Sequence, residues 1–117
     1  MNRILVIEDE ERMRQGLCTL LRLEGYEVAG AADGEAGLRA AREARPDLIL
    51  CDVMMPRLDG HGVLSALRED PEFAGIPFVF LTARGEKHEV RAGMNLGADD
   101  YLTKPVSRDE LVQTVTA

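Results

Sequence analysis

The chain has 117 residues, of which 45% are apolar and 30% charged, and its formal net charge is −7. This length suits one globular domain that buries enough apolar surface to fold without disulfides. The acidic balance argues against a nucleic-acid-binding surface in this domain and favours basic or cationic partners.

The sequence carries no sign of a membrane or secretory address. No apolar run approaches the roughly 18 residues of a membrane-spanning helix. The apolar stretch at residues 4–7 is too short for the core of a signal peptide, so we expect a cytoplasmic domain. Cys18 and Cys51 belong to no Cys-x-x-Cys pair and no Cys/His cluster. We expect two reduced core thiols, and a disulfide between them is the alternative.

The first half of the chain is predicted to form three strands separated by two helices. Apolar runs predict strands over residues 3–7 and 48–51, and a weaker strand over 28–31 suits a sheet edge. Asp33-Gly34 is either a turn or the N-cap of an alanine-rich second helix. Gly25 is a suitable stop for the first helix, whose apolar residues at helical spacing are Met13, Leu17, Leu20 and Leu21.

A third helix and a fourth strand follow. The helix begins at Asp59-Gly60, and a loop over residues 71–77 separates it from an apolar strand over 78–81. The residues expected on the apolar face of this helix are Gly60, Val63, Leu64 and Leu67.

The last part of the chain predicts two helices around a short strand. The helix over residues 87–96 has a poor apolar face and contains Gly93, which weakens it. A strand over 101–103 follows, and a capping box over 107–110 opens the fifth helix. This helix reaches Ala117 without a C-cap signal, so we expect the natural chain to continue beyond it.

Strands that alternate with helices imply a parallel sheet with helices on both faces. Three of the predicted strands are continuous apolar runs, as strands buried on both sides require. We therefore predict a single α/β domain over residues 1–117, a (βα)5 unit that forms the N-terminal part of a longer chain.

Polar residues stand where four of these strands end. In open α/β sheets ligands bind at the carboxyl ends of the strands, where the chain places Glu8, Asp9, Asp52, Thr82 and Lys104. Three carboxylates against one lysine leave a net charge of about −2, which suits a hard divalent cation such as Mg²⁺. We expect Asp9 and Asp52 to bind it directly with the backbone carbonyl of Met54, and Glu8 to act through water. Mn²⁺ is expected to substitute.

With the cation bound, Asp52 is a candidate nucleophile toward a phosphoryl group, because aspartyl phosphate is an established covalent species. The transition state of phosphoryl transfer spreads charge over three oxygens. We expect Mg²⁺ to take one, Lys104 the second, and the Thr82 hydroxyl with the Ala83 N–H the third.

Taken together, these residues resemble the response-regulator receiver domain of two-component signalling, over residues 3–117. The matching motifs are Ile7-Glu8-Asp9, Asp52-Val53-Met54-Met55-Pro56, Asp59-Gly60, Leu81-Thr82-Ala83, Gly97-Ala98-Asp99-Asp100-Tyr101-Leu102 and Lys104-Pro105. The family commonly has two aspartates where this chain has Glu8 and Asp9.

The resemblance implies a flavodoxin-like doubly wound fold with strand order 2-1-3-4-5. It implies that Asp52 accepts a phosphoryl group from a sensor histidine kinase or a histidine phosphotransfer protein. It also implies that Thr82 and Tyr101 are switch residues and that the Lys104–Pro105 peptide is cis. As an alternative, Tyr101 is merely a half-buried aromatic at the sheet edge.

These features predict a phosphorylation-controlled binding module and not a classical enzyme. It catalyses its own Mg²⁺-dependent phosphorylation and dephosphorylation, then signals through the face made by the fourth helix, the last strand and the fifth helix. That face is expected to bind an output domain or a downstream protein, or to form a phosphorylation-dependent homodimer. Contacts with nucleic acid or membrane are not expected from this domain.

Two rival functions share parts of this pattern. A phosphatase of the haloacid-dehalogenase type also uses an aspartate at a strand end with Mg²⁺, but usually has a second aspartate two residues later, where this chain has Met54. A degenerate receiver that serves only as a scaffold usually lacks part of the acid, aspartate, threonine and lysine set, which is complete here.

Overall fold

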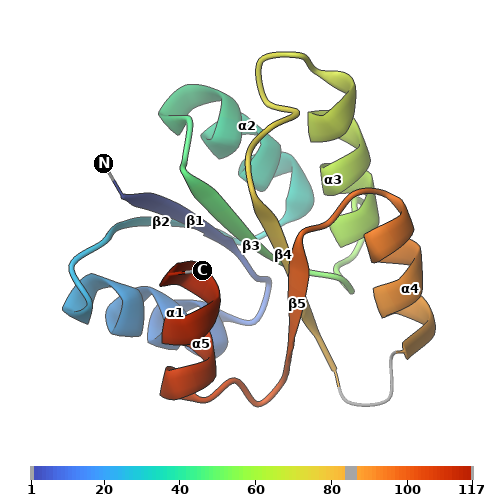
Figure 1. The fold of residues 1–117 in the computed structure, drawn as a ribbon. Coiled ribbons are helices and arrows are strands. Elements are labelled where there is room, and N and C mark those ends of the chain that lie inside the picture. Colours follow the sequence, from blue (N-terminus) through green and yellow to red (C-terminus); the bar gives the residue numbers. More distant parts are fainter. Residues whose placement is uncertain (1, 84–86, 117) are drawn as a thin grey trace.

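The computed structural model describes residues 2–83 and 87–116, and the side chains of all of these except 87–90. Within this part of the chain, strands and helices alternate (Figure 1). The strands are β1 (Arg3–Ile7), β2 (Glu27–Ala31), β3 (Leu48–Asp52), β4 (Phe78–Thr82) and β5 (Asp100–Thr103). The helices are α1 (Glu11–Leu23), α2 (Gly34–Ala44), α3 (Gly60–Glu69), α4 (Lys87–Asn95) and α5 (Arg108–Thr116).

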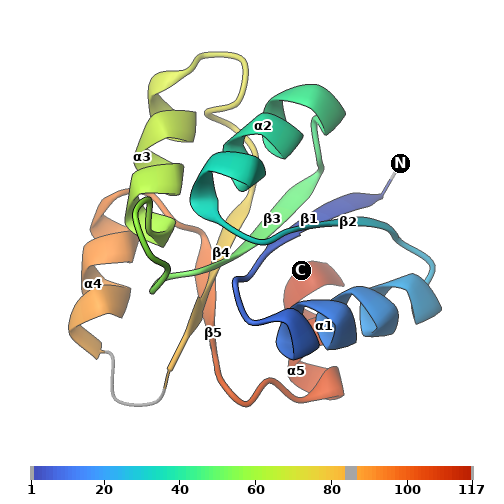
Figure 2. The same ribbon diagram turned by 180° about the vertical axis from the view of Figure 1, so that it is seen from behind.

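The strands form one sheet in the order β2-β1-β3-β4-β5, and each neighbouring pair is parallel. Helices α1 and α5 cover one face, and α2, α3 and α4 lie on the other (Figures 1 and 2). The flavodoxin-like fold class and strand order are therefore confirmed. The weaker strand, β2, is an edge strand as predicted.

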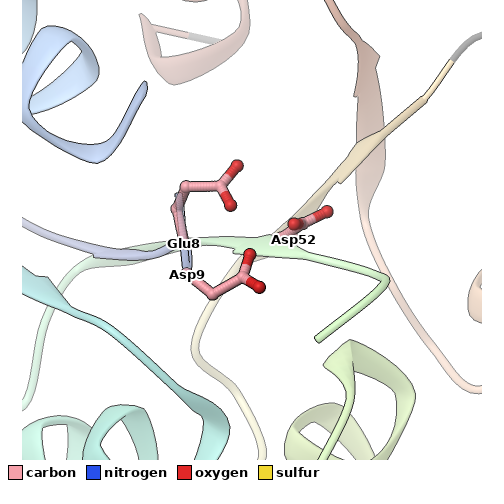
Figure 3. A group of neighbouring side chains, drawn as sticks. All are labelled: Glu8, Asp9 and Asp52. Atoms are coloured by element: carbon pink, nitrogen blue, oxygen red, sulfur yellow. The ribbon is translucent and has the colours of Figure 1, made fainter. Parts of the chain in front are cut away.

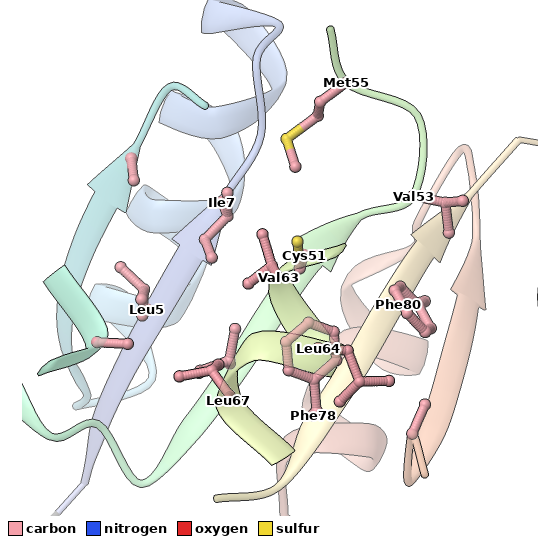
Figure 4. Close-up of a cluster of buried hydrophobic side chains, with 14 of the residues drawn as sticks. Leu5, Ile7, Cys51, Val53, Met55, Val63, Leu64, Leu67, Phe78 and Phe80 are labelled. Carbon is pink, nitrogen blue, oxygen red and sulfur yellow. The ribbon is translucent and has the colours of Figure 1, made fainter. Parts of the chain in front are cut away.

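Alternating side chains of the central strands fill two separate cores. In β1, Leu5 and Ile7 pack with α2 and α3, in a cluster that includes Phe78 and Phe80 (Figure 4). Ile4 and Val6 point to the opposite face, where the cluster includes Leu17 and Leu21 of α1 and Leu111 of α5. This burial on both sides is the reason why β1, β3 and β4 are continuous apolar runs.

The element boundaries differ from the predictions by one residue in places. Strand β2 begins at Glu27, whose N–H donates to the carbonyl of Asn2, and β5 begins at Asp100, which pairs with Val79. Backbone pairing needs no apolar side chain, so polar residues extend both strands beyond their apolar runs. Asp33 proves to be an N-cap, because its side chain accepts from the N–H of Ala36.

The predicted capping box at the start of α5 is present with one altered contact. Ser107 Oγ accepts from the N–H of Glu110, as the motif requires. The Glu110 carboxylate accepts from the Ser107 hydroxyl instead of its backbone N–H. No helix in the described residues is long and apolar enough to cross a membrane.

Cys18 and Cys51 are both free and buried. They belong to the two different cores: Cys18 lies on α1, and Cys51 points to the opposite face of the sheet. The expectation of reduced core thiols is confirmed, and the alternative of a disulfide between them is wrong. Burial raises the pKa of both thiols.

Candidate functional site

The residues at the carboxyl ends of four strands meet at one edge of the sheet. Ile7 of β1 pairs with Cys51 of β3, so the next residues, Glu8 and Asp52, lie side by side. Asp52 pairs with Leu81 of β4, and Thr82 pairs with Thr103 of β5. Lys104 comes next, and its N–H donates a hydrogen bond of 2.7 Å to the carbonyl of Thr82. The parallel register thus gathers the polar strand ends.

Three carboxylates form the centre of this edge. One oxygen from each of Glu8, Asp9 and Asp52 lies within 4.8 Å of the other two. Figure 3 shows the side chains of Glu8 and Asp9 leaving the chain on opposite sides and turning toward Asp52. Glu8 is 0% exposed and Asp52 5%, whereas Asp9 is exposed to solvent. The cluster therefore opens toward solvent on the Asp9 side.

Lys104 contacts two of these carboxylates. Its Nζ lies 2.8 Å from Glu8 Oε1 and 3.2 Å from Asp52 Oδ2. Burial by itself lowers the pKa of Lys104, but the contact with Glu8 and the charge of Asp52 outweigh this and raise the pKa. Lys104 therefore stays charged at neutral pH and leaves a net charge of about −2 on the cluster. The peptide bond between Lys104 and Pro105 is cis.

The Glu8 side chain is fully buried beneath the other two carboxylates. Its Oε2 accepts a hydrogen bond of 3.1 Å from the N–H of Glu10. Its Oε1 is buried, and the contact that the structure gives it is the ion pair of 2.8 Å with Lys104 Nζ. Both carboxylate oxygens of Glu8 therefore contact groups of the protein itself.

The electrostatics of Asp9 also favour a cation. Partial burial raises the pKa of Asp9, and the neighbouring Glu8 raises it further through direct contact and charge. The backbone contact of Asp9 and the charge of Lys104 oppose this shift without cancelling it. The carboxylates therefore repel one another. A hard cation with oxygen ligands fits this donor set and its charge.

The backbone around Asp52 is held tightly. The N–H of Val53 donates to the carbonyl of Leu81, and the carbonyl of Val53 accepts from the N–H of Gly60 at 2.9 Å. Met54 follows at once, with a side chain that is 57% exposed. Asp59 caps α3 by accepting from the N–H of Gly62. The start of α3 is thus fixed directly against the end of β3.

The two residues expected to act as a switch lie on neighbouring strands, and their side chains leave the sheet on the same face, because Tyr101 pairs with Phe80, two residues before Thr82. Thr82 is 1% exposed, with its carbonyl bonded to Lys104. Ala83 follows it and is exposed. Tyr101 lies on the edge strand β5 and is 44% exposed, so its side chain faces solvent in this structure. Their roles as switch residues stay predictions.

Sequence reasoning missed Arg14. Its Nη1 donates a hydrogen bond of 2.9 Å to the backbone carbonyl of Glu8. The available signal was weak: an arginine in the first turns of α1, four residues before the buried Cys18. Its significance depends on how α1 packs against β2.

Comparisons with known proteins point in one direction. Residues 4–116 match the family described as the response regulator receiver domain. The ycf27 protein of Cyanophora paradoxa is 47% identical over 109 residues, which cover 93% of this chain and 44% of that protein. The DNA-binding response regulator MtrA of Mycolicibacterium paratuberculosis is 44% identical over 115 residues, which cover 98% of this chain and 50% of that protein. The chain thus spans about half the length of these curated relatives.

A solved structure agrees with this match. The chemotaxis protein CheY4 of Vibrio cholerae is 33% identical and superposes with a TM-score of 0.93. The superposition covers 99% of this chain and 97% of that one. The similarity therefore extends over the whole fold and includes each strand end of the site.

Proposed function

Since this chain belongs to the response regulator receiver domain family, whose members are phosphoaccepting switches in two-component signalling, we propose that Asp52 is its phosphoryl acceptor. The observation that carries this proposal is the meeting of Asp52 with two other carboxylates and Lys104 at the carboxyl edge of the sheet. Glu8 is a poorer acceptor because it is fully buried and both its oxygens face donors or cations inside the protein. Asp9 is exposed and stands at the open side of the cluster, where a metal ligand is needed.

The donor we propose is a phosphohistidine of a sensor histidine kinase or a histidine phosphotransfer protein. The Asp52 carboxylate attacks phosphorus, the P–N bond of the phosphohistidine breaks, and the imidazole leaves. Lys104 is placed to neutralise one phosphoryl oxygen, because its Nζ already lies 3.2 Å from Asp52 Oδ2. The Thr82 hydroxyl, at the end of the neighbouring strand β4, and the Ala83 N–H directly after it are assigned to another oxygen. Hydrolysis of the P–O bond by water at the same site returns Asp52.

The proposed cofactor is Mg²⁺, with Mn²⁺ as a substitute. Asp9, Asp52 and the backbone carbonyl of Met54 would hold it directly, and Glu8 through water. When bound, this ion supplies positive charge that reduces repulsion between the incoming phosphoryl group and the carboxylates. The fit rests on the three clustered carboxylates, the net charge of about −2 that Lys104 leaves, and the exposure of Asp9.

The output is proposed to be a change of the face formed by α4, β5 and α5. Tyr101 and two further large apolar side chains, Met94 and Leu96, are exposed on this part of the molecule. Phosphorylation adds charge and acceptor oxygens that attract Thr82, and Tyr101 then turns inward. The changed face would bind an output domain or a downstream protein, or a second copy of this chain, in the cytoplasm.

Incubation with acetyl phosphate and Mg²⁺ tests the acceptor. Intact-mass spectrometry should detect one phosphoryl group per chain, stable in acid and labile in base. Asp52→Asn should abolish labelling. Asp59→Asn is the matched control, because asparagine also caps helices and Asp59 lies at the start of α3. The proposal would be contradicted if Asp52→Asn were still labelled, or if the wild-type chain were not phosphorylated.

A further inference from the structure

Arg14 of α1 reaches back to the acidic edge of the sheet. Its Nη1 donates a hydrogen bond of 2.9 Å to the backbone carbonyl of Glu8, six residues earlier, from a half-buried position. Lys104, in contrast, pairs with the carboxylates of Glu8 and Asp52. Arg14 therefore acts on the backbone between β1 and α1 and leaves the carboxylate oxygens free for other partners.

The Glu8 residue is held from three directions. Its N–H donates to the carbonyl of Ala31 at 3.0 Å, its carbonyl accepts from Arg14, and its Oε2 accepts from the N–H of Glu10. The carbonyl that Arg14 holds belongs to the peptide bond that joins Glu8 to Asp9. Because a peptide group is planar, fixing this carbonyl fixes the plane from which the Asp9 side chain departs.

We propose that Arg14 is a positioning residue for the metal site, which sets the direction of the Asp9 carboxylate through the Glu8–Asp9 peptide group. This inference rests on the proposed function, in which Asp9 binds the metal directly. Groups that orient metal ligands without touching the metal commonly change metal affinity strongly when they are removed. Arg14 is not a catalytic residue, because it contacts neither the carboxylates nor the expected place of the phosphoryl group.

The path of the Arg14 side chain depends on Gly30 of β2. A Cβ built on Gly30 would lie 3.3 Å from Arg14 Cδ and 3.4 Å from Arg14 Cγ. The stem of Arg14 therefore crosses β2 where the strand has no side chain. Gly30→Ala would crowd this stem without removing the guanidinium, and so disturbs the same contact by a second route.

Arg22 provides a matched control on the same helix. Its Nη2 donates a hydrogen bond of 3.0 Å to the carbonyl of Val28, again six residues away in the chain. Val28 lies in the edge strand β2, away from the acidic cluster. Removing Arg22 therefore deletes the same kind of contact, between an α1 arginine and a backbone carbonyl, without touching the peptide that carries Asp9.

The test measures the affinity for Mg²⁺ from the changes of amide chemical shifts in an NMR titration of the unphosphorylated protein. Arg14→Ala should weaken Mg²⁺ binding about tenfold, in line with other groups that orient metal ligands. Arg14→Lys should recover part of this loss, because an ammonium can donate to the same carbonyl but less rigidly. Arg22→Ala should bind Mg²⁺ as the wild type does.

A second readout separates positioning from a general loss of structure. At saturating Mg²⁺, acetyl phosphate should label Arg14→Ala at nearly the wild-type rate, because the defect lies in metal affinity. A variant that merely loosens α1 would label slowly at every Mg²⁺ concentration, and that result would contradict the inference.

The possible failures are distinguishable. If the wild type binds Mg²⁺ and Arg14→Ala binds it equally well, the inference is wrong and the proposed function stands. Equal weakening by Arg22→Ala would also overturn it. If Arg14→Ala does not fold, Gly30→Ala decides: reduced Mg²⁺ affinity supports the inference, and unchanged affinity contradicts it. A wild type that does not respond to Mg²⁺ would contradict the proposed function itself.

Discussion

Gly60, the first residue of α3, lies so close to Asp52 that a Cβ built on it would come within 2.4 Å of the Asp52 carbonyl oxygen. The same Cβ would lie 2.9 Å from Val53 Cα. Both neighbours are backbone atoms, which cannot move aside cheaply. Gly60→Ala should therefore push α3 away from β3, destabilise the domain by about 1–3 kcal/mol and slow the labelling of Asp52 by acetyl phosphate.

Gly16 is the matched control for this substitution. It lies inside α1, and a Cβ there meets nothing within 4 Å. Gly16→Ala should stabilise the protein by about 0.5–1 kcal/mol, because glycine is the poorer helix former. Urea unfolding of both variants measures the two effects. If Gly60→Ala and Gly16→Ala had the same free energy of unfolding, α3 would not be packed tightly against Asp52.

The positions of the main site residues could be predicted because they depend only on topology. Glu8 and Lys104 follow directly on a strand and Asp52 ends one, and neighbouring parallel strands bring such residues together whatever their side chains do. The apolar runs and their turns were enough to place them. The exact packing distances between elements were not needed.

Features that depend on packing distances could not be predicted. The path of Arg14 to the Glu8 carbonyl depends on how closely its stem packs against Gly30 of β2. The contact of Gly60 with Asp52 likewise depends on how far α3 lies from the sheet. The burial of Glu8 could be predicted in part. Side chains alternate along a strand, and Ile7 points to the face covered by α2 and α3, so Glu8 turns to the other face.

Mg²⁺ should stabilise the folded domain. The raised pKa of Asp9 means that the fold disfavours the charge of this residue at neutral pH, chiefly through partial burial and the neighbouring Glu8. A ligand that binds only the folded state at a hundred times its dissociation constant adds about 2.7 kcal/mol. Thermal unfolding should therefore shift upward with Mg²⁺ and return after EDTA.

Asp9→Asn distinguishes this effect from a general influence of salt. Without metal the variant should unfold at a higher temperature than the wild type, because one repelling charge is gone. It should then gain much less from Mg²⁺. Glu11→Gln, an exposed acidic residue in the first turn of α1, should respond to Mg²⁺ as the wild type does. Equal gains in all three proteins would contradict a metal site at Asp9.

Lys104→Met should separate metal binding from phosphoryl transfer. Removing the ammonium changes the charge of the cluster from about −2 to about −3, so Mg²⁺ should bind more tightly. Labelling of Asp52 should nevertheless become slower, because one phosphoryl oxygen loses its cation. Without metal, the buried Glu8 loses its partner, and we expect a loss of roughly 1–3 kcal/mol, reduced from that of a fully buried pair because Lys104 is partly exposed.

Arg108→Met is the control for losing a basic residue. Arg108 pairs with Glu24 at 2.6 Å, but its side chain is 65% exposed, so the loss of stability should be much smaller. Mg²⁺ affinity and labelling should not change. If Lys104→Met bound Mg²⁺ more weakly than the wild type, the inference that the positive charge of Lys104 lowers the affinity for the metal would be wrong.

The buried thiols predict a fall in stability at alkaline pH. Burial raises the pKa of Cys18 and of Cys51 above the ordinary value of 9.0. Above pH 9 the unfolded chain loses these protons while the folded chain keeps them, so the unfolded state binds fewer protons and the free energy of unfolding falls as pH rises. Each thiol that stays protonated contributes a slope of about 1.4 kcal/mol per pH unit. Urea midpoints between pH 8 and 10 should fall less steeply in a variant that combines Cys18→Ala with Cys51→Ala, and an unchanged slope would show that other groups cause the decline.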